Sequence, residues 1–442
     1  MILSHKIFGV AGKPILHSKS PDIFKYISMK YNILDNSYIR IISDSARETV
    51  EIMKSLDICG LNITYPFKAD ILDYIDEISK EAELISSVNV IISEDKRLIG
   101  YNTDYLGVIN SIKEKNIDVI GKRCLVIGCG GAGRAAVYGM IQSGMKVKII
   151  NRTNDIAKDF ANRIKCEFAE WNCLVDEINN SDLIINTVPS GELNIDEYLT
   201  EGKYILQADY SKLSNKLQGD VISGIHWLVN QAIPSFEHFT GVNLREDNEV
   251  SESLRGFLEP SNPGVQKKGN IALIGFIGSG KTTIGKMLAK KINWDFFDTD
   301  EMIVNEENIP IKEIFRTRGE SYFRNLEKEV LLSLKDKKNI IISCGGGLIL
   351  EEENSALLKE MSNIFWVYSP VEICIERLKS ELRPPLTNPF DSTIDPIEKA
   401  EILLKYRIPY YCDIADALLY NNSLLTDAVD KIYDEVHTYF GY

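Results

Sequence analysis

Two glycine-rich stretches constrain this chain more than any other feature of its sequence. The first is "VIGCGGAGRA", Val126 to Ala135, and the second is "IGFIGSGKTT", Ile274 to Thr283. Each follows an apolar run of strand type and precedes a segment of helix length. Because the N–H groups at a helix N-terminus attract anions, both stretches predict turns that bind nucleotide phosphates. The sequence therefore predicts two nucleotide sites in one chain.

Length and charge limit what else the chain can be. At roughly 100–200 residues per domain, its 442 residues predict two to four domains. The formal net charge of −14 gives a surface that repels nucleic acid and anionic membranes. Anionic ligands must therefore bind at local positive sites. We expect small-molecule ligands and no nucleic-acid partner, and the oligomeric state stays open.

The cysteines and the lengths of the apolar runs indicate in which cellular compartment the protein is expected. The start, "MILSHKIFGVAGKPILHS", lacks a basic segment followed by a long apolar core, which argues against a secretory signal. No apolar run reaches the ~18 residues of a membrane span. The eight cysteines form no C-x-x-C pair, and unpaired cysteines suit a reducing compartment. We expect a cytoplasmic protein without a membrane partner.

Apolar runs of strand type alternate with helix-length segments along nearly the whole chain. This order predicts an α/β fold, and short continuous apolar runs are typical of parallel strands buried on both faces. The segment "EPSNPGVQKKGN", 259–270, has two prolines and two glycines and predicts an inter-domain linker. Examples of the strand-type runs are "CLVIG" at 124–128, "VKII" at 147–150, "DLIINTV" at 182–188, "IALIGF" at 271–276 and "IIISC" at 340–344.

The first glycine-rich stretch fits the pattern G-x-G-x-x-G at Gly128, Gly130 and Gly133. In this pattern the first glycine permits a tight turn and the second lets the backbone approach a pyrophosphate. The third lets helix and strand pack closely. We expect Gly131 and Ala132, at the start of the helix, to belong to the same phosphate site. The alternative is a glycine-rich turn without a ligand.

The end of the next strand indicates which dinucleotide this turn binds. A site for NAD usually has an acidic residue there, about 20 residues on, that holds the ribose 2′-hydroxyl. This chain has Asn151, Arg152 and Thr153 instead. An acid would repel a 2′-phosphate, whereas Arg152 attracts one, so the sequence predicts NADP(H). The alternative is that Arg152 is a solvated surface residue.

Several segments of the N-terminal part resemble, in order and spacing, the motif series of shikimate dehydrogenases. The resemblance covers roughly residues 1–258. It implies an α/β substrate domain at 1–104, completed by a return helix at about 236–258, and a Rossmann NADP-binding domain at 105–235. The segments are "GKPILHSKSP" (12–21), "LNITYPFK" (61–68), "SSVNV" (86–90), "GYNTD" (100–104) and the closing motif "GIHWLVNQA" (224–232).

The residue types in these motifs suit the chemistry of such an enzyme. Reduction of a ketone needs a proton for the nascent alkoxide, and Lys68 with Asp104 forms an acid–base couple. By resemblance, Lys68 is the acid/base, Asp104 positions it, and Gly224 belongs to the NADP site. For each charged residue alone, the alternative is a surface salt bridge. The expected substrate contacts are Ser18, Ser20, Asn62, Thr64, Asn89, Asp104 and Gln231.

Three positions depart from the family pattern. Val90 stands where a threonine usually follows the asparagine of the third segment. Lys212 stands where a substrate-contacting tyrosine would fall, with Tyr210 displaced, so we assign no substrate tyrosine. Ile156 replaces a second arginine, for which Lys158 is a candidate substitute. The strength of the NADP preference therefore stays open, although its direction does not.

The second glycine-rich stretch matches G-x-x-x-x-G-K-[ST] from Gly275 to Thr282. In such a P-loop the backbone N–H groups hold phosphates, the lysine reaches the β- and γ-phosphates, and the hydroxyl ligates Mg²⁺. The pattern predicts an ATP site in which Lys281 and Thr282 fill these two roles. The expected ATP-binding residues are Gly278, Ser279, Gly280, Lys281, Thr282 and Thr283.

The residues after the P-loop resemble shikimate kinase over roughly 269–442. "FFDTD" supplies Asp298 and Asp300, whose spacing at a strand end points both carboxylates to one side. By resemblance, Asp300 contacts the substrate hydroxyl as the candidate base, and Asp298 helps to organise Mg²⁺. Arginine forks suit a ring carboxylate. The remaining residues implied by the resemblance are Arg324, Gly346 and Arg407 for the substrate and the lid arginine Arg383 for ATP.

The leading interpretation is a chain of two fused enzymes, in which a linker at 259–269 precedes a P-loop kinase domain at 270–442 with a parallel sheet. The first enzyme would reduce 3-dehydroshikimate with NADPH. The second would phosphorylate shikimate to shikimate 3-phosphate with MgATP. Three alternatives stay open: a dehydrogenase half that prefers quinate with NAD, a metabolite-sensing pseudoenzyme, and a different small-molecule P-loop kinase.

Overall fold

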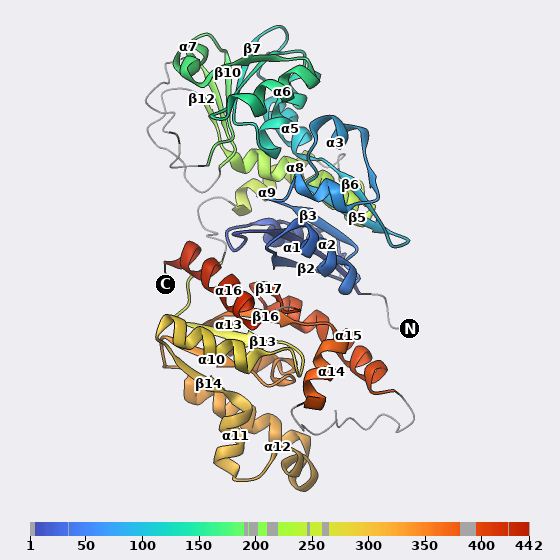
Figure 1. The fold of residues 1–442 in the computed structure, drawn as a ribbon, viewed down its shortest axis with the longest axis vertical. Helices are drawn as coiled ribbons and strands as arrows, with labels where there is room; N and C mark the ends of the chain where they lie inside the picture. Colours follow the sequence, from blue (N-terminus) through green and yellow to red (C-terminus); the bar gives the residue numbers. More distant parts are fainter. Residues whose placement is uncertain are drawn as a thin grey trace. The chain divides into compact units, whose positions relative to one another are not determined.

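A computed structural model shows two compact units that do not follow the order of the chain (Figure 1). The first contains residues 1–21, 33–58 and 263–442, and the second contains 22–32 and 59–262. The N-terminal strands therefore belong to the same unit as the P-loop part. The residues that the structure describes are 5–33, 35–189, 193, 202–209, 220–244, 248–258, 265–380, 395–422 and 424–441.

The first unit is built on a parallel sheet. The P-loop strands pair in parallel with one another, and the last of them, β17, pairs with β2 from the start of the chain. The register places Leu418 opposite Ile41 and Leu419 opposite Ile42. In sheet order the strands are β14 (Asp295–Asp298), β15 (Ile340–Ser343), β13 (Asn270–Ile274), β16 (Ser362–Tyr368), β17 (Ala417–Tyr420), β2 (Asn36–Ile42) and β1 (Lys6–Gly12).

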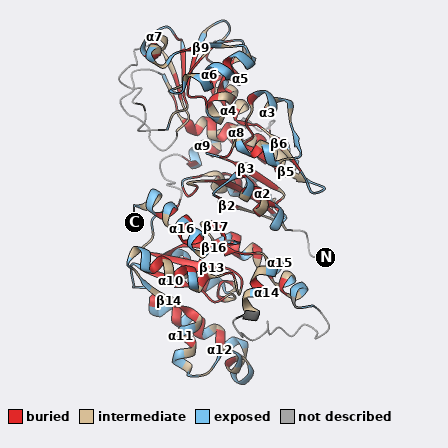
Figure 2. Cartoon of the chain, viewed as in Figure 1, coloured by how far each residue is buried: buried red, intermediate tan, exposed pale blue. Residues whose placement is uncertain are grey.

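Helices cover this sheet because both of its faces are apolar. Alternate strand residues such as Leu273 and Val367 share one buried cluster with residues of α10 and α16. Figure 2 shows the strands buried while the helices keep exposed outer faces. The helices of this unit are α2 (Ala46–Ser55), α10 (Lys281–Ile292), α11 (Thr299–Glu307), α12 (Ile311–Leu334), α13 (Glu352–Met361), α14 (Val371–Ser380), α15 (Pro396–Ile414) and α16 (Leu425–Phe440).

The second unit contains a six-stranded parallel sheet that carries the first glycine-rich turn. Its order is that of a doubly wound fold, because the chain goes outward from β7 in both directions. The strands in sheet order are β12 (Asp220–Ile222), β11 (Tyr204–Gln207), β10 (Leu183–Asn186), β7 (Arg123–Ile127), β8 (Lys146–Ile150) and β9 (Glu167–Ala169).

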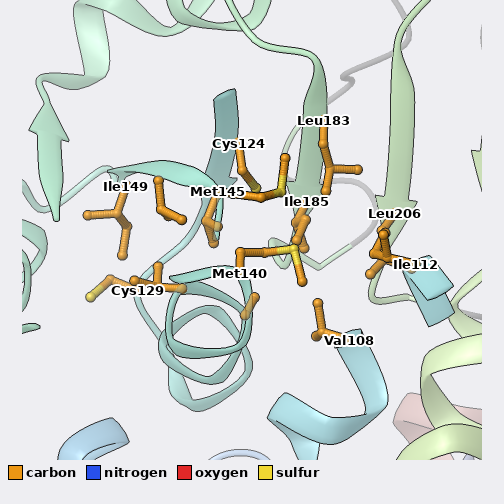
Figure 3. Close-up of a cluster of buried hydrophobic side chains, with 14 of the residues drawn as sticks. Val108, Ile112, Cys124, Cys129, Met140, Met145, Ile149, Leu183, Ile185 and Leu206 are labelled. Atoms are coloured by element: carbon orange, nitrogen blue, oxygen red, sulfur yellow. The ribbon is translucent and has the colours of Figure 1, made fainter. Parts of the chain in front are cut away.

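One core cluster fixes α5 (Gly131–Gln142) against this sheet (Figure 3). Met140 and Met145 are buried among strand residues such as Cys124 and Ile185. Unbranched methionine side chains fill irregular gaps of this kind. The other helices that pack in this part are α4 (Asp104–Glu114), α6 (Asn154–Ile164) and α7 (Leu174–Asn179).

The rest of the second unit holds smaller strands beside the long helix α8 (Gly224–Thr240). Strand β5 is antiparallel to both β3 and β6, while β4 and β6 are parallel. Helix α8 packs along α4, and α9 (Asn248–Leu258) packs against α8. The bounds of the other elements are α1 (Ser20–Lys30), β3 (Gly60–Ile63), β4 (Glu77–Ile78), α3 (Lys80–Ile85), β5 (Val90–Glu94) and β6 (Arg97–Tyr101).

The predicted α/β fold with largely parallel sheets is confirmed, and the antiparallel strands around β5 are its local exception. The predicted domain boundaries remain predictions. Residues 259–264 of the proposed linker, and also Tyr210 and Lys212, lie outside the described residues. Within the described part of the chain, no helix is both long and apolar enough to cross a membrane.

Candidate functional sites

The predicted acid–base couple forms a direct ion pair. Lys68 Nζ lies 2.6 Å from Asp104 Oδ2, and the side chains are 18% and 7% exposed. Lys68 follows β3 in the turn that begins at Thr64, and Asp104 is the first residue of α4. Since one side of the lysine remains accessible, the pair can exchange a proton with a bound molecule. A surface salt bridge would be more exposed than this.

Asparagine amides fix the position of Asp104. Asn89 Nδ2 donates to Asp104 Oδ1 at 3.0 Å and to Gln231 Oε1 at 3.2 Å. Asn62 Nδ2 donates to the carbonyl oxygen of Asn89 at 3.1 Å. From the other side, Trp227 Nε1 donates to the main-chain oxygen of Asp104 at 2.9 Å. The predicted residues Asn62, Asn89, Asp104 and Gln231 therefore lie together, and half-buried Thr64 is close in the chain to Lys68.

The first glycine-rich turn has the geometry that its pattern requires. Gly128 has φ +102°, a left-handed conformation that glycine adopts readily. A Cβ atom at Gly133 would lie 2.1 Å from the carbonyl oxygen of Gly128, whereas one at Gly130 would meet nothing within 4 Å. The first and third glycines are therefore needed by the fold. The second leaves open space in front of the N-terminus of α5.

This turn lies next to the acid–base pair. A Cβ atom at Gly131 would be 3.0 Å from Lys68 Cβ and 2.6 Å from Ser87 Oγ. Ser87 Oγ is buried and has no hydrogen-bond partner among the described residues. The N-terminus of α5 and Lys68 therefore lie side by side. Ala132, at the second position of α5, is half-buried beside this space.

The end of β8 holds the turn from the other side. Asn151 Oδ1 accepts a hydrogen bond from Cys129 N–H at 3.2 Å, and Asn151 Nδ2 donates to the carbonyl oxygen of Thr153 at 3.1 Å. Arg152 is exposed directly beside these residues. Gly224, at the start of α8, approaches β11 so closely that a Cβ atom would lie 2.7 Å from the carbonyl oxygen of Gln207.

Ser18 and Ser20 lie in the first compact unit, with the loop that follows β1. Ser18 is 5% exposed, and its hydroxyl donates to Ser20 Oγ at 3.3 Å. Ser20 N–H donates back to Ser18 Oγ at 3.3 Å. The hydroxyl groups of the two predicted serines therefore lie together at the start of α1.

In the P-loop, Lys281 is folded back onto its own turn. Its Nζ donates to the carbonyl oxygens of Gly275 and Phe276 at 3.0 and 2.9 Å. Burial lowers the pKa of Lys281, while the carboxylates of Asp300 and Asp298 act in the opposite direction. A buried ammonium whose hydrogen-bond partners within the described residues are carbonyl oxygens is well placed to bind phosphate oxygens. The loop residues Gly278, Ser279 and Gly280 lead directly into α10, which also carries Thr282 and the exposed Thr283.

Thr282 and Asp298 are hydrogen-bonded to each other, with Thr282 Oγ1 2.8 Å from Asp298 Oδ2. Asp298 also caps α11, because its Oδ1 accepts from the N–H groups of Asp300 and Glu301 at 3.1 and 3.2 Å. Hydroxyl and carboxylate oxygens beside a phosphate loop are the hard donors that Mg²⁺ prefers, with few protein ligands and the rest from phosphate and water. This donor set therefore fits Mg²⁺.

The three glycines after β15 lie against the predicted kinase substrate residues. A Cβ atom at Gly345 would be 2.4 Å from Asp300 Oδ1, and one at Gly347 would be 2.7 Å from Arg324 Nη1. At Gly346 it would be 3.2 Å from Arg407 Nη1. The structure therefore brings Asp300 and the two arginines around one glycine segment, where side chains would close the space between them.

The two arginines beside this glycine segment differ in their hydrogen-bond partners. Arg324 Nη1 donates to Glu327 Oε2 at 2.7 Å, and burial raises the pKa of Glu327 to about 7 in spite of this partner. Arg407 Nε is buried and has no hydrogen-bond partner in the described part of the chain. A donor left in this state has a large unmet desolvation cost, which an anionic ligand would remove. Arg383 lies outside the described residues.

Several residues of both sites were missed by sequence reasoning. Thr103 Oγ1 lies 2.9 Å from Ser235 Oγ and accepts from Asn89 Nδ2 at 2.9 Å. In the P-loop, Asn421 Nδ2 donates to the carbonyl oxygen of Ser279 at 2.7 Å. Thr103 stands inside the quoted "GYNTD" segment, so its motif was a usable signal. Ser235 and Asn421 stand in no motif.

Comparisons with known proteins match the N-terminal part and the P-loop part of the chain to different families. Residues 10–91 match the family model of the shikimate dehydrogenase substrate binding domain, and 111–204 match that of shikimate / quinate 5-dehydrogenase. Residues 277–437 match the model of shikimate kinase. The chain belongs to both families. The predicted pairing of a shikimate-pathway oxidoreductase with a kinase in one chain is therefore confirmed.

The matched region spans most of the length of each of these relatives. The shikimate dehydrogenase (NADP(+)) of Caldanaerobacter subterraneus subsp. tengcongensis is 33% identical over 276 residues, which are 57% of this chain and 97% of the relative. The shikimate kinase of Persephonella marina is 46% identical over 117 residues, 26% of this chain and 71% of the relative. The crystal structure of shikimate dehydrogenase from Aquifex aeolicus matches with a TM-score of 0.52 at 27% identity, over 57% of this chain and 98% of that one.

Proposed function

We propose that the chain catalyses two consecutive reactions, the reduction of 3-dehydroshikimate by NADPH and the phosphorylation of shikimate by MgATP. One observation supports this most strongly. The Lys68–Asp104 pair lies beside a dinucleotide-type turn, and Lys281 lies beside Asp298 and Asp300 in a separate P-loop. Each turn therefore has its own reactive groups.

In the dehydrogenase reaction, NADPH would supply, when bound, the hydride for the carbonyl carbon of 3-dehydroshikimate. Lys68 gives its proton to the oxygen, so that C=O becomes CH–OH and NADPH becomes NADP⁺. Asp104, held by Asn89, keeps the lysine ammonium in place and accepts a hydrogen bond from the substrate. Short hydroxyl and amide groups bind the ring: Ser18, Ser20, Asn62, Thr64, Asn89 and Gln231.

NADP(H) is the proposed cofactor of this half. Gly130 and the N-terminus of α5 would hold the pyrophosphate, because this is the open side of the turn. Arg152, exposed beside Asn151 and Thr153, would attract the 2′-phosphate. The name of the Caldanaerobacter relative specifies NADP(+), which supports the same cofactor for this chain.

In the kinase reaction, a hydroxyl of shikimate attacks the γ-phosphorus of ATP, which releases ADP and shikimate 3-phosphate. Asp300 takes the proton from that hydroxyl, and Lys281 balances the charge on the transferred phosphoryl group. Arg324 and Arg407 bind the ring carboxylate and orient the acceptor. Thr282 and Asp298 would hold Mg²⁺, which supplies charge neutralisation at the β- and γ-phosphates when bound.

A matched assay tests substrate and cofactor choice in the first half. Purified protein is supplied with shikimate and NADP⁺, and in parallel with quinate and NAD⁺. We expect kcat/KM to be higher for shikimate with NADP⁺, because Arg152 stands at the strand end where an NAD site usually has an acidic residue. A preference for quinate with NAD⁺ would instead support the alternative dehydrogenase. Absence of turnover with either pair would support the pseudoenzyme.

A further inference from the structure

The loop that carries the predicted substrate serines shares a core with the P-loop part of the chain. We refer to residues 13–20 as the serine loop. Ile15 and Leu16 in this loop are fully buried, at 0% exposure. They belong to one apolar cluster with Val429 and Ile432 of α16, near the other end of the chain. Folding of the serine loop therefore depends on α16.

A buried carboxylate of α16 binds the backbone of this loop. Ile15 N–H donates to both oxygens of Glu435 at 3.0 Å, and Leu16 N–H donates to Oε2 at 3.3 Å. Glu435 is 1% exposed, and burial raises its pKa to about 7. Burying a carboxyl group costs free energy unless the group is hydrogen-bonded. The hydrogen bonds from the loop backbone therefore offset the cost of burying Glu435 at this position.

The end of the serine loop is held by a second connection. Arg40 of β2 is 7% exposed, and its Nε and Nη2 donate to the carbonyl oxygen of Ser18 at 2.9 and 2.6 Å. Its Nη1 donates to the carbonyl oxygen of Asp416 at 3.5 Å, just before β17. Ser18 in turn is hydrogen-bonded to Ser20. Glu435 therefore contacts the loop backbone just before the serines, and Arg40, which also reaches Asp416 of the P-loop part, contacts it at Ser18.

Ion pairs close the edges of this contact. Lys13 Nζ lies 2.7 Å from Asp44 and 3.3 Å from Asp434. Lys431, which is 3% exposed in its side chain, is paired with Glu48 and lies 3.2 Å from Asp44. Together with the pairing of β17 and β2, these contacts combine apolar burial, strand pairing and charge pairing.

We propose that the kinase part of this chain positions the serine loop of the dehydrogenase, and that Glu435 is a positioning residue for the dehydrogenase reaction. The proposal rests on the proposed function, in which Ser18 and Ser20 contact the dehydrogenase substrate. Glu435 acts through the backbone of Ile15 and Leu16 and does not touch the substrate. A residue of the second enzyme thus sets the affinity of the first.

Full-length Glu435→Ala and Glu435→Gln variants test this, with both activities measured by steady-state kinetics. We expect the dehydrogenase KM for shikimate to rise about tenfold in Glu435→Ala, because hydrogen bonds to a charged group are lost. Glu435→Gln keeps the shape and one acceptor, so its rise should be smaller. The dehydrogenase kcat, its KM for NADP⁺ and the kinase KM for shikimate should stay within about twofold of wild type.

Asp434→Asn is the matched control, because it removes the neighbouring carboxylate that faces the Lys13 side chain and not the loop backbone. It should leave the dehydrogenase KM unchanged. An unchanged KM in both Glu435 variants would overturn the proposal, and so would a parallel loss of both activities, which indicates general destabilisation. If Glu435→Ala does not fold, the isosteric Glu435→Gln decides by the same criteria.

Ser18→Ala and Ser20→Ala test the substrate contacts of the serines separately from the positioning role of Glu435. If these variants leave the dehydrogenase KM for shikimate unchanged, the substrate assignment in the proposed function fails. If they raise the KM while the Glu435 variants do not, the assignment stands and only the positioning role of Glu435 is wrong. A rise in all four supports both.

Discussion

The two glycine-rich turns differ in where each places its cation. In the first, Gly130 borders open space, and the nearby cation Lys68 comes from a different element. In the second, Lys281 is part of the turn and is buried against the turn's own carbonyl oxygens. The first turn also has a cation on one of its own carbonyl oxygens, because Arg134 Nε donates to the carbonyl oxygen of Cys129 at 3.1 Å. The turns therefore differ in the burial of this cation, since Arg134 is half-buried and Lys281 is buried.

The glycines of the two turns differ at one position. In the P-loop, Gly275, Gly278 and Gly280 all have positive φ, and a Cβ atom at each would meet neighbouring atoms at 2.3, 2.5 and 2.7 Å. In the first turn, Gly128 and Gly133 are as closely surrounded, at 2.5 and 2.1 Å, whereas a Cβ atom at Gly130 would meet nothing within 4 Å. Both loops therefore need glycine for close packing, and the first has in addition one glycine that faces open space.

The largest expected effect separates the two reactions. Lys68→Ala removes the proton donor of the dehydrogenase and leaves the P-loop intact. We expect the dehydrogenase kcat to fall about 10²–10⁴-fold, the usual contribution of a positioned acid or base, while the kinase rate stays unchanged. The measurement is NADP⁺-dependent shikimate oxidation beside ADP release in the same preparation. Unchanged dehydrogenase turnover would contradict the assignment of Lys68.

The reciprocal change sharpens the comparison. Lys281→Ala removes the cation that lies within the P-loop, so charge on the transferred phosphoryl group loses its balance. We expect a fall of about 10²–10³-fold in kinase kcat, similar to the loss of other preorganised charge donors, and normal dehydrogenase activity. Shikimate-dependent ADP formation measures this. Retained kinase activity would show that phosphoryl transfer does not use this lysine.

Two alanine substitutions in the first turn should have opposite profiles. Gly133→Ala places a Cβ atom 2.1 Å from a backbone oxygen and should destabilise the unit by about 1–3 kcal/mol. Gly130→Ala meets open space, so it should leave the thermal midpoint unchanged and raise the KM for NADP⁺ roughly tenfold. Thermal melts and cofactor titrations distinguish them. Equal effects on stability would mean that Gly130 is structural.

A smaller effect concerns pH in the kinase site. Burial raises the pKa of Glu327 to about 7, and the carboxylates of Asp300 and Glu351 act in the same direction. Glu327 therefore loses its proton as pH rises from 6 to 8. The ionised carboxylate then competes more strongly with the substrate carboxylate for Arg324. We expect the kinase KM for shikimate to rise a few-fold over this range, and Glu327→Gln to flatten the profile. A profile unchanged in Glu327→Gln would assign the titration elsewhere.

Local sequence patterns predicted much of both sites. The spacing of glycines predicted the turns, and the strand–turn–helix context predicted where they lie. The turns depend on residue type and spacing, which a single sequence contains. The Lys68–Asp104 contact and the grouping of Asp300 with Arg324 and Arg407 were expected only from the resemblance to the two families.

The contacts of Glu435 could not be predicted in this way. This residue stands in an amphipathic helix, where a glutamate normally lies on the solvated face. Its partners are 420 and 419 residues away, and no spacing rule links such positions. The pairing of β17 with β2 has the same origin, since it joins strands from opposite ends of the chain within one sheet. Long-range pairing of this kind becomes visible only in three dimensions.

A coupled assay shows whether one chain catalyses the two successive reactions. Purified full-length protein receives 3-dehydroshikimate, NADPH and MgATP, with absorbance at the NADPH band and ADP followed together. We expect NADPH to be consumed first and ADP formation to follow it and to depend on it. In Lys68→Ala, ADP should appear only when shikimate is added. ADP formation at the same rate without NADPH, or NADPH loss without subsequent ADP, would contradict it.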